Sequence, residues 1–231
     1  MRPPIEFFNI YGVWINLIYY LLVSIVCFWI FQKTKAAYEL TSYEGIKYFR
    51  NTFLFFGITT IIKLFLSLMQ IPAVHALIPM GFDFFILRAG FFVMVYTSSL
   101  ALIYIIYSIF WKRITGPVLT NAYFINLIAL IIALLSLPER NAFIFLILQS
   151  FLFAILIIAS YLTNKQTNKT QKHHLSKLYG IYFLIFALWL ISNFLELITV
   201  FSPIFGVLIY IISIIVFFIL LDKVAGRLKF K

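Results

Sequence analysis

Long apolar runs, separated by short polar stretches, fill almost the whole of this 231-residue chain. About 20 apolar residues in a helix span the ~30 Å hydrocarbon core of a bilayer, at a rise of about 1.5 Å per residue. The pattern therefore predicts an all-α integral membrane protein: a bundle of seven transmembrane helices that forms a single domain over residues 1–231. The predicted spans are 8–31, 50–71, 84–110, 117–137, 141–162, 178–201 and 203–221.

The composition supports lipid as the surroundings of this chain. Hydrophobic residues make up 64% of the sequence and charged residues 11%, whereas a soluble domain carries about 25% charged residues. Because seven spans and their loops use up the chain, we expect no separate kinase, nucleotide-binding or protease domain. The net charge of +11 comes mostly from loops, so it indicates membrane orientation and not nucleic-acid binding.

The basic residues alternate between the two sides of the predicted bundle. The first, third and fifth connections and the C-terminal tail are rich in Lys and Arg, whereas the second and sixth have none and the fourth has only Arg140. Basic loops tend to stay on the cytoplasmic side. The pattern predicts a multi-pass protein of the cell membrane with its N-terminus outside and its C-terminus inside.

The first connection, residues 33–49, mixes charged and aromatic residues. Two structures fit this composition. The stretch either extends the two flanking helices into the cytoplasm or lies on the membrane surface.

Three charged residues stand out within the predicted spans, away from their first residues, where a charge costs about 2.5–3.5 kcal/mol at the helix centre. They are Lys63, Arg88 and Glu196. With the predicted topology, Lys63 lies about 12 Å below the outer end of its span, and Arg88 and Glu196 lie about 8 Å deep. All three fall in the outer half of the bilayer, and residues of this kind tend to face the interior of a bundle.

Neutral polar residues lie at similar depth in other spans, and helical spacing turns several of them toward a common face. Thr60, Lys63 and Ser67 recur at three- and four-residue spacing, so they share one face of their helix. We therefore expect a ligand-binding pocket in the outer half of the bundle. Its expected lining residues are Lys63, Arg88, Glu196, Asn193, Gln149 and Asn16.

The charges of this pocket favour an anionic ligand. Glu196 neutralises at most one of the cations Lys63 and Arg88, and the remaining positive charge suits a carboxylate or a phosphate. Three other interpretations stay open. The polar residues hold helices together, Arg88 extends to the headgroups, or the charges drive a conformational switch.

Known seven-span classes fit in part. The gross topology resembles that of opsins and G-protein-coupled receptors, but the predicted span 203–221 has no lysine to hold retinal as a Schiff base. The sequence also lacks the motifs of intramembrane proteases and lipid-processing enzymes. We expect no enzymatic activity, no catalytic residue, no cofactor and no metal site.

Three short stretches carry a resemblance to other proteins. Residues 38–41 (YELT), 45–50 (GIKYFR) and 53–57 (FLFFG) resemble uncharacterised archaeal seven-span membrane proteins. This resemblance implies a sensor-like membrane protein.

We therefore expect a sensor or receptor-like module that binds a small polar or anionic ligand in the outer half of the bundle. Its expected partners are membrane lipids, that ligand and a cytoplasmic signalling protein that meets the basic loops. A small-solute transporter and a structural or assembly subunit are the alternatives. A polar seam that reaches the inner face would suit transport, and polar residues that act in packing alone would suit assembly.

Overall fold

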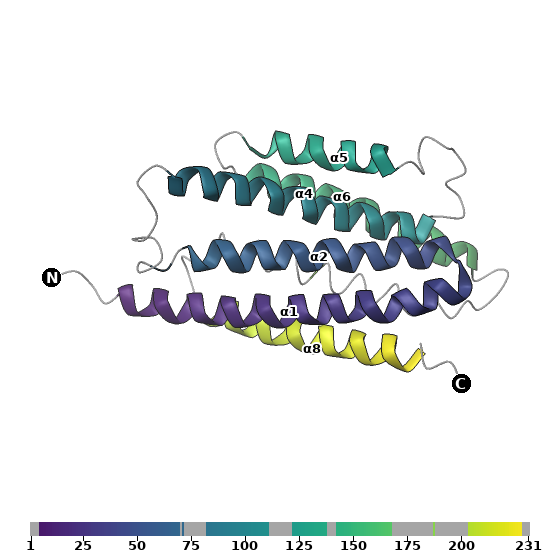
Figure 1. Ribbon diagram of the computed structural model, residues 1–231, viewed down its shortest axis with the longest axis horizontal. Coiled ribbons are helices and arrows are strands. Elements are labelled where there is room, and N and C mark those ends of the chain that lie inside the picture. Colours follow the sequence, from purple (N-terminus) through teal and green to yellow (C-terminus); the bar gives the residue numbers. More distant parts are fainter. Residues whose placement is uncertain are drawn as a thin grey trace.

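The computed structural model describes residues 5–69, 71, 82–110, 122–137, 142–167, 187 and 203–227 of the chain. The described part is all-helical, as the sequence predicts, and Figure 1 shows its helices lying alongside one another. The six helices are α1 (Ile5–Thr41), α2 (Glu44–Leu68), α4 (Phe82–Phe110), α5 (Ala122–Leu135), α6 (Ala142–Thr167) and α8 (Pro203–Arg227).

Helix α2 lies in the middle of the bundle, between α1 and α4, and packs extensively against both (Figure 1). On the α4 side of α2, α4 packs against α5 and α6. On the α1 side, α1 packs against α8. Helices α1, α4, α6 and α8 run in one direction, and α2 and α5 run in the opposite direction. Neighbours in sequence are therefore antiparallel over α1, α2, α4, α5 and α6.

A tight turn of Ser42 and Tyr43 joins α1 to α2. The Ser42 N–H donates to the Tyr38 carbonyl at 2.7 Å, and Ser42 has a φ of 50°, in the left-handed region. The Ile46 N–H donates to the Tyr43 carbonyl at 2.9 Å, which starts α2. Of the two structures that fit residues 33–49, the extension of both helices is confirmed. We call the end of the bundle that carries this turn the turn end.

Predicted and observed helix bounds agree best where a proline or a polar stretch ends the apolar run. Helix α4 ends at Phe110, as predicted, and α8 begins at Pro203, a residue favoured in the first turn of a helix. Helix α8 continues past the predicted end at residue 221, and the described part of the predicted span 117–137 is helical over Ala122–Leu135. The predicted span 178–201 lies outside the described residues except for position 187, which is helical.

The outward faces of the helices are as apolar as the packed ones. On α1 the exposed side chains include a stripe at helical spacing, formed by Trp14, Ile18, Leu21, Ile25 and Trp29. Water does not favour so much exposed apolar surface, whereas lipid accommodates it.

Three helices in the described part are long and apolar enough to cross a bilayer, over Trp14–Thr41, Glu44–Leu68 and Phe84–Phe110. Shorter apolar helical stretches lie at Ala122–Leu135, Ile144–Ile158 and Tyr210–Ile219. These lengths and compositions indicate membrane association.

Two glycines allow close packing against α2. A Cβ at Gly57 would lie 3.3 Å from Cys27 Cβ and 3.3 Å from the Phe28 ring, so α1 and α2 approach closely there. A Cβ at Gly90 on α4 would lie 2.7 Å from a methyl carbon of Leu66 on α2. Small residues at helix interfaces let membrane helices gain dispersion contacts, since lipid offers no hydrophobic drive between them.

Candidate functional site

Lys63 is buried in the middle of the bundle, with 5% of its surface exposed. Its Nζ lies over the ring of Tyr20 on α1, 5.4 Å from the ring centroid. A cation over an aromatic face is attracted by the ring quadrupole, and more strongly where water is excluded. The structure thus places a lysine amine at the interface of α1 and α2.

Two more tyrosines and a serine extend this group toward α8. The Tyr19 ring lies 5.3 Å from that of Tyr20 and 4.4 Å from that of Tyr210. The hydroxyls of Tyr19 and Ser213 form a buried hydrogen bond of 2.9 Å. We call Tyr19, Tyr20, Lys63, Tyr210 and Ser213 the Lys63 centre; α1, α2 and α8 each contribute to it.

The spacing of α2 explains how Lys63 comes to be buried. Thr60, Lys63 and Ser67 are all buried, so the shared inward face that their spacing predicts is confirmed. The Thr60 hydroxyl donates to the Gly57 carbonyl one turn earlier, at 2.8 Å. This local bond satisfies the threonine within its own helix.

A second polar group, which we call the hydroxyl belt, joins α2, α4 and α6. The hydroxyls of Thr59 and Thr97 lie 2.8 Å apart. Gln149 Nε2 donates to Ser98 Oγ at 3.2 Å and to Ser99 Oγ at 2.9 Å. Thr59 lies one helical turn from Lys63 on α2, so the belt and the Lys63 centre are neighbours along that helix.

The amide of Gln149 is fully buried, yet one of its two ends is not satisfied. Its Oε1 has no hydrogen-bond partner in the structure. With the amide oxygen and nitrogen exchanged, the nitrogen would be left unsatisfied instead. An unpaired buried polar group costs about 1–3 kcal/mol. A hydrogen-bond donor that reached the Gln149 oxygen would therefore recover part of this cost.

The other residues expected in the pocket have different surroundings. Arg88 is exposed on α4, with its guanidinium carbon 5.5 Å from the centroid of the Phe84 ring, and is not buried beside Lys63. Arg88 lies near the start of its helix, where a long side chain reaches the surface easily. Asn16 is partly buried and lies one turn before Tyr20 on α1. Asn193 and Glu196 lie outside the described residues.

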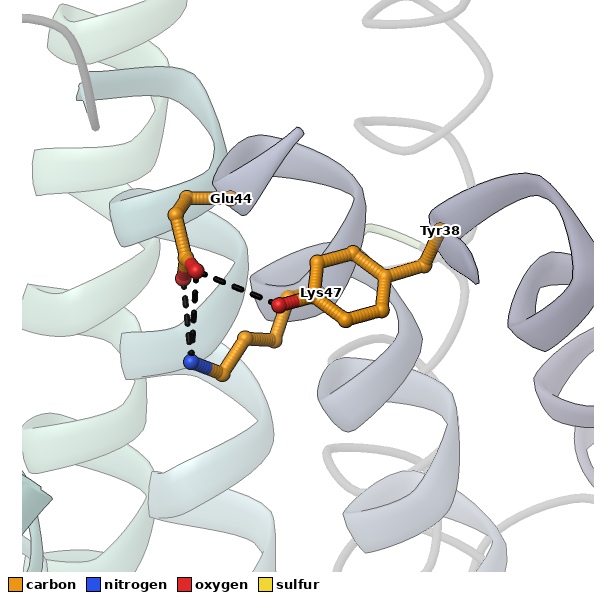
Figure 2. A network of polar contacts seen from close by, with 3 residues as sticks. All are labelled: Tyr38, Glu44 and Lys47. Atoms are coloured by element: carbon orange, nitrogen blue, oxygen red, sulfur yellow. Dashed lines mark hydrogen bonds and ion pairs between the residues drawn. The ribbon is translucent and has the colours of Figure 1, made fainter. Parts of the chain in front are cut away.

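The turn end carries a third polar group, shown in Figure 2. Glu44 receives a hydrogen bond of 3.2 Å from the Tyr38 hydroxyl and forms an ion pair of 3.0 Å with Lys47. Arg50 also lies near this group, with its guanidinium carbon 5.5 Å from the Tyr38 ring centroid. Both members of the ion pair are partly exposed, so its contribution to stability is small.

Sequence reasoning missed two parts of these groups. It did not pair Tyr19 with Ser213, because nothing local shows that α1 and α8 are neighbours. The three-residue spacing of Tyr210 and Ser213 on an apolar helix is a signal that could have marked this face. It also gave Arg50 no binding role, since Tyr38, one of the two rings beside it, lies on an extension of α1 that carries no apolar run.

Comparison with known proteins adds one relative. The chain is 29% identical over 231 residues to an uncharacterized protein of Archaeoglobus fulgidus, and the match covers 98% of this chain and 96% of the relative. No protein-family model matches the chain, and no solved structure matches it. The relative supports the archaeal part of the resemblance noted in the sequence.

Proposed function

We propose that this chain is a seven-span protein of the cell membrane, with its N-terminus outside and its C-terminus inside. The directions of the helices support this count. Helix α1 begins at one end of the bundle and α8 ends at the other, as an odd number of crossings requires (Figure 1). Helices α6 and α8 run in the same direction, which agrees with one more crossing between them, where the sequence predicts 178–201.

We infer that the Lys63 centre binds a small anion, such as a carboxylate. The observation that carries this proposal is a lysine with 5% exposure whose amine lies over the Tyr20 ring, next to further tyrosine and serine side chains of α1 and α8. A charge at this depth is costly to keep, and charged residues within membrane bundles mark binding or transport sites by default. Tyrosine and serine hydroxyls add hydrogen-bond donors that suit an anion.

The packing toward the turn end favours a sensor over a transporter. Phe56 on α2 and Phe217 on α8 are buried and stack with ring centroids 5.9 Å apart, two turns of α2 from Lys63. This apolar contact between α2 and α8 lies on the turn-end side of Lys63, which suits a bundle that is closed toward the turn end. A sensor needs a closed half, and a ligand that draws α1, α2 and α8 together would change the turn end, where a cytoplasmic partner would meet basic residues.

A small-solute transporter is the second candidate, and the hydroxyl belt favours it. The belt continues the polar groups from Lys63 across α2, α4 and α6. The same bonds also hold helices together, which is the reading in which this chain is a structural or assembly subunit. Flux measured in proteoliposomes separates transport from the other two functions.

Thermal melts of the full-length protein in detergent test the ligand proposal. A panel of small carboxylates, phosphates and sugars is added to wild type, to Lys63→Met and to the control Lys35→Met. Lys35 is exposed on α1 and pairs with Glu39 at 3.8 Å, so its replacement removes the same charge outside the bundle.

A ligand at 100 times its dissociation constant stabilises by about 2.7 kcal/mol. We expect one anion to stabilise wild type and Lys35→Met but not Lys63→Met. Equal stabilisation of all three proteins would contradict the proposal. If no ligand stabilises wild type and Lys63→Met is strongly destabilised, the result would favour a structural or assembly subunit.

A further inference from the structure

Arg50 is held between two aromatic rings at the turn end. Its guanidinium carbon lies 5.2 Å from the Phe31 ring centroid and 5.5 Å from the Tyr38 ring centroid. Its Nε is buried without a hydrogen-bond partner, and the guanidinium forms no ion pair within the described ranges. The side chain as a whole is partly exposed. A cation therefore lies near two aromatic rings with hydrogen-bonding capacity left over.

The continuation of α1 past the predicted span 8–31 brings Tyr38 into this arrangement. Phe31 and Tyr38 are seven residues apart, about two turns, so they lie on one face of α1. Arg50 reaches that face from α2, because the tight turn at Ser42 and Tyr43 brings the two helices side by side. The rings restrict the guanidinium, so less rotamer entropy is lost when its planar fork of N–H donors meets an oxyanion.

The neighbouring carboxylate is already engaged. Glu44 accepts a hydrogen bond of 3.2 Å from the Tyr38 hydroxyl and forms an ion pair of 3.0 Å with Lys47 (Figure 2). Its charge is therefore balanced by Lys47 and not by Arg50. The stretch 33–50 holds four cations and two carboxylates, so the turn end keeps an excess of positive charge.

The depth of Arg50 matches that of a phosphate layer. It lies seven residues into α2 from the turn, about 10 Å along the helix, and it opens the predicted apolar span 50–71. If α2 crosses a bilayer, this is the boundary between hydrocarbon and headgroups, where clustered basic residues meet anionic lipid.

We propose that Arg50 binds a phosphate group, supplied by an anionic lipid headgroup or by free phosphate. Arginine matches phosphate oxygens with two parallel N–H bonds, which a lysine cannot do. This site lies about 20 Å along α2 from Lys63, so it is separate from the proposed anion site and stands without it.

Melts of the full-length protein at several lipid concentrations test this site. Phosphatidylglycerol, phosphatidylcholine and sodium phosphate, the last against sodium chloride at equal ionic strength, are added to wild type, Arg50→Gln, Arg50→Lys and the control Lys35→Gln. We expect saturable stabilisation of wild type by phosphatidylglycerol and not by phosphatidylcholine. Arg50→Gln should weaken the apparent affinity about ten-fold or more, and Lys35→Gln less than about three-fold.

The arms of the experiment separate the sources of the phosphate. Stabilisation by sodium phosphate alone that depends on Arg50 supports the site with free phosphate as its ligand. Stabilisation by neither probe, full stabilisation of Arg50→Gln, or an equal loss in Lys35→Gln overturns the proposal. If Arg50→Gln does not fold, Arg50→Lys decides: a loss of more than about three-fold beyond Lys35→Gln supports the site, and a smaller loss overturns it.

Discussion

The hydroxyls of Tyr19 and Ser213 share a buried hydrogen bond of 2.9 Å, although 194 residues separate them in the chain. This bond ties α1 to α8 beside Lys63. Tyr19→Phe should remove it and keep the ring contacts with Tyr20 and Tyr210. Since polar contacts between membrane helices average about 0.6 kcal/mol, we expect a loss of stability of about 0.5–1.5 kcal/mol.

Unfolding of Tyr19→Phe by denaturant in mixed micelles, beside the control Tyr161→Phe, measures this loss. Tyr161 is 65% exposed on α6, so the same change is made there on an outward-facing side chain. An equal effect of both substitutions would contradict the assignment of the bond.

The close approach of α1 and α2 at Gly57 makes a second prediction. A Cβ there meets Cys27 Cβ and the Phe28 ring at 3.3 Å, so Gly57→Ala should cost little and Gly57→Leu about 1–3 kcal/mol by overpacking. The same unfolding assay provides the measurement. Combining Gly57→Leu with Phe28→Leu, which removes the ring that the new side chain meets, should recover part of the loss, and additive losses would argue against direct contact.

The half-satisfied amide of Gln149 predicts that the stability lost in Ser99→Ala depends on whether Gln149 is present. Ser99→Ala removes an acceptor 2.9 Å from Nε2 and leaves more of the buried amide unpaired, so it should cost about 1 kcal/mol or more. In the Gln149→Met background the same serine change should cost much less. A double-mutant cycle measures the coupling; a coupling near zero would show that the bond carries no stability.

The helix directions predict where two engineered cysteines are accessible. Ser42 lies at the turn end and Ile71 just beyond the opposite end of α2. In a Cys27→Ala background, we expect a membrane-impermeant maleimide on intact cells to label Ile71→Cys and not Ser42→Cys. Permeabilised cells should give labelling of both. Labelling of Ser42→Cys from outside would reverse the proposed orientation, and equal labelling of both would contradict a crossing by α2.

Sequence reasoning predicted helix ends well where an apolar run gives way to polar residues or to a proline. Apolar runs predicted the helix that ends at Phe110, and Pro203 marked the start of α8. It could not choose between structures for residues 33–49, because a helix that leaves the bilayer needs no apolar run. The continuation of α1 to Thr41 rests on packing against α2 and on the turn at Ser42.

The sequence predicted how deep the residues of the candidate site lie in the bundle, but less well which way their side chains face. Thr60, Lys63 and Ser67 stood out as polar residues on one face, and all are buried. Arg88 has a similar depth in the sequence but is exposed. When both lipid-facing and protein-facing surfaces are apolar, spacing shows which residues share a face and not which neighbour that face meets. Contacts between distant helices, such as Tyr19 with Ser213, depend on that missing information.

Direct binding at the Lys63 centre tests the central claim best. Equilibrium dialysis of the anion that gives the largest melt shift, against full-length wild type and Lys63→Met, measures stoichiometry and affinity. The account predicts one site per chain in wild type and a loss of about ten-fold or more in affinity in Lys63→Met, because a charge-assisted contact of about 1.5–3 kcal/mol is removed. Unchanged affinity in a folded Lys63→Met protein would contradict it.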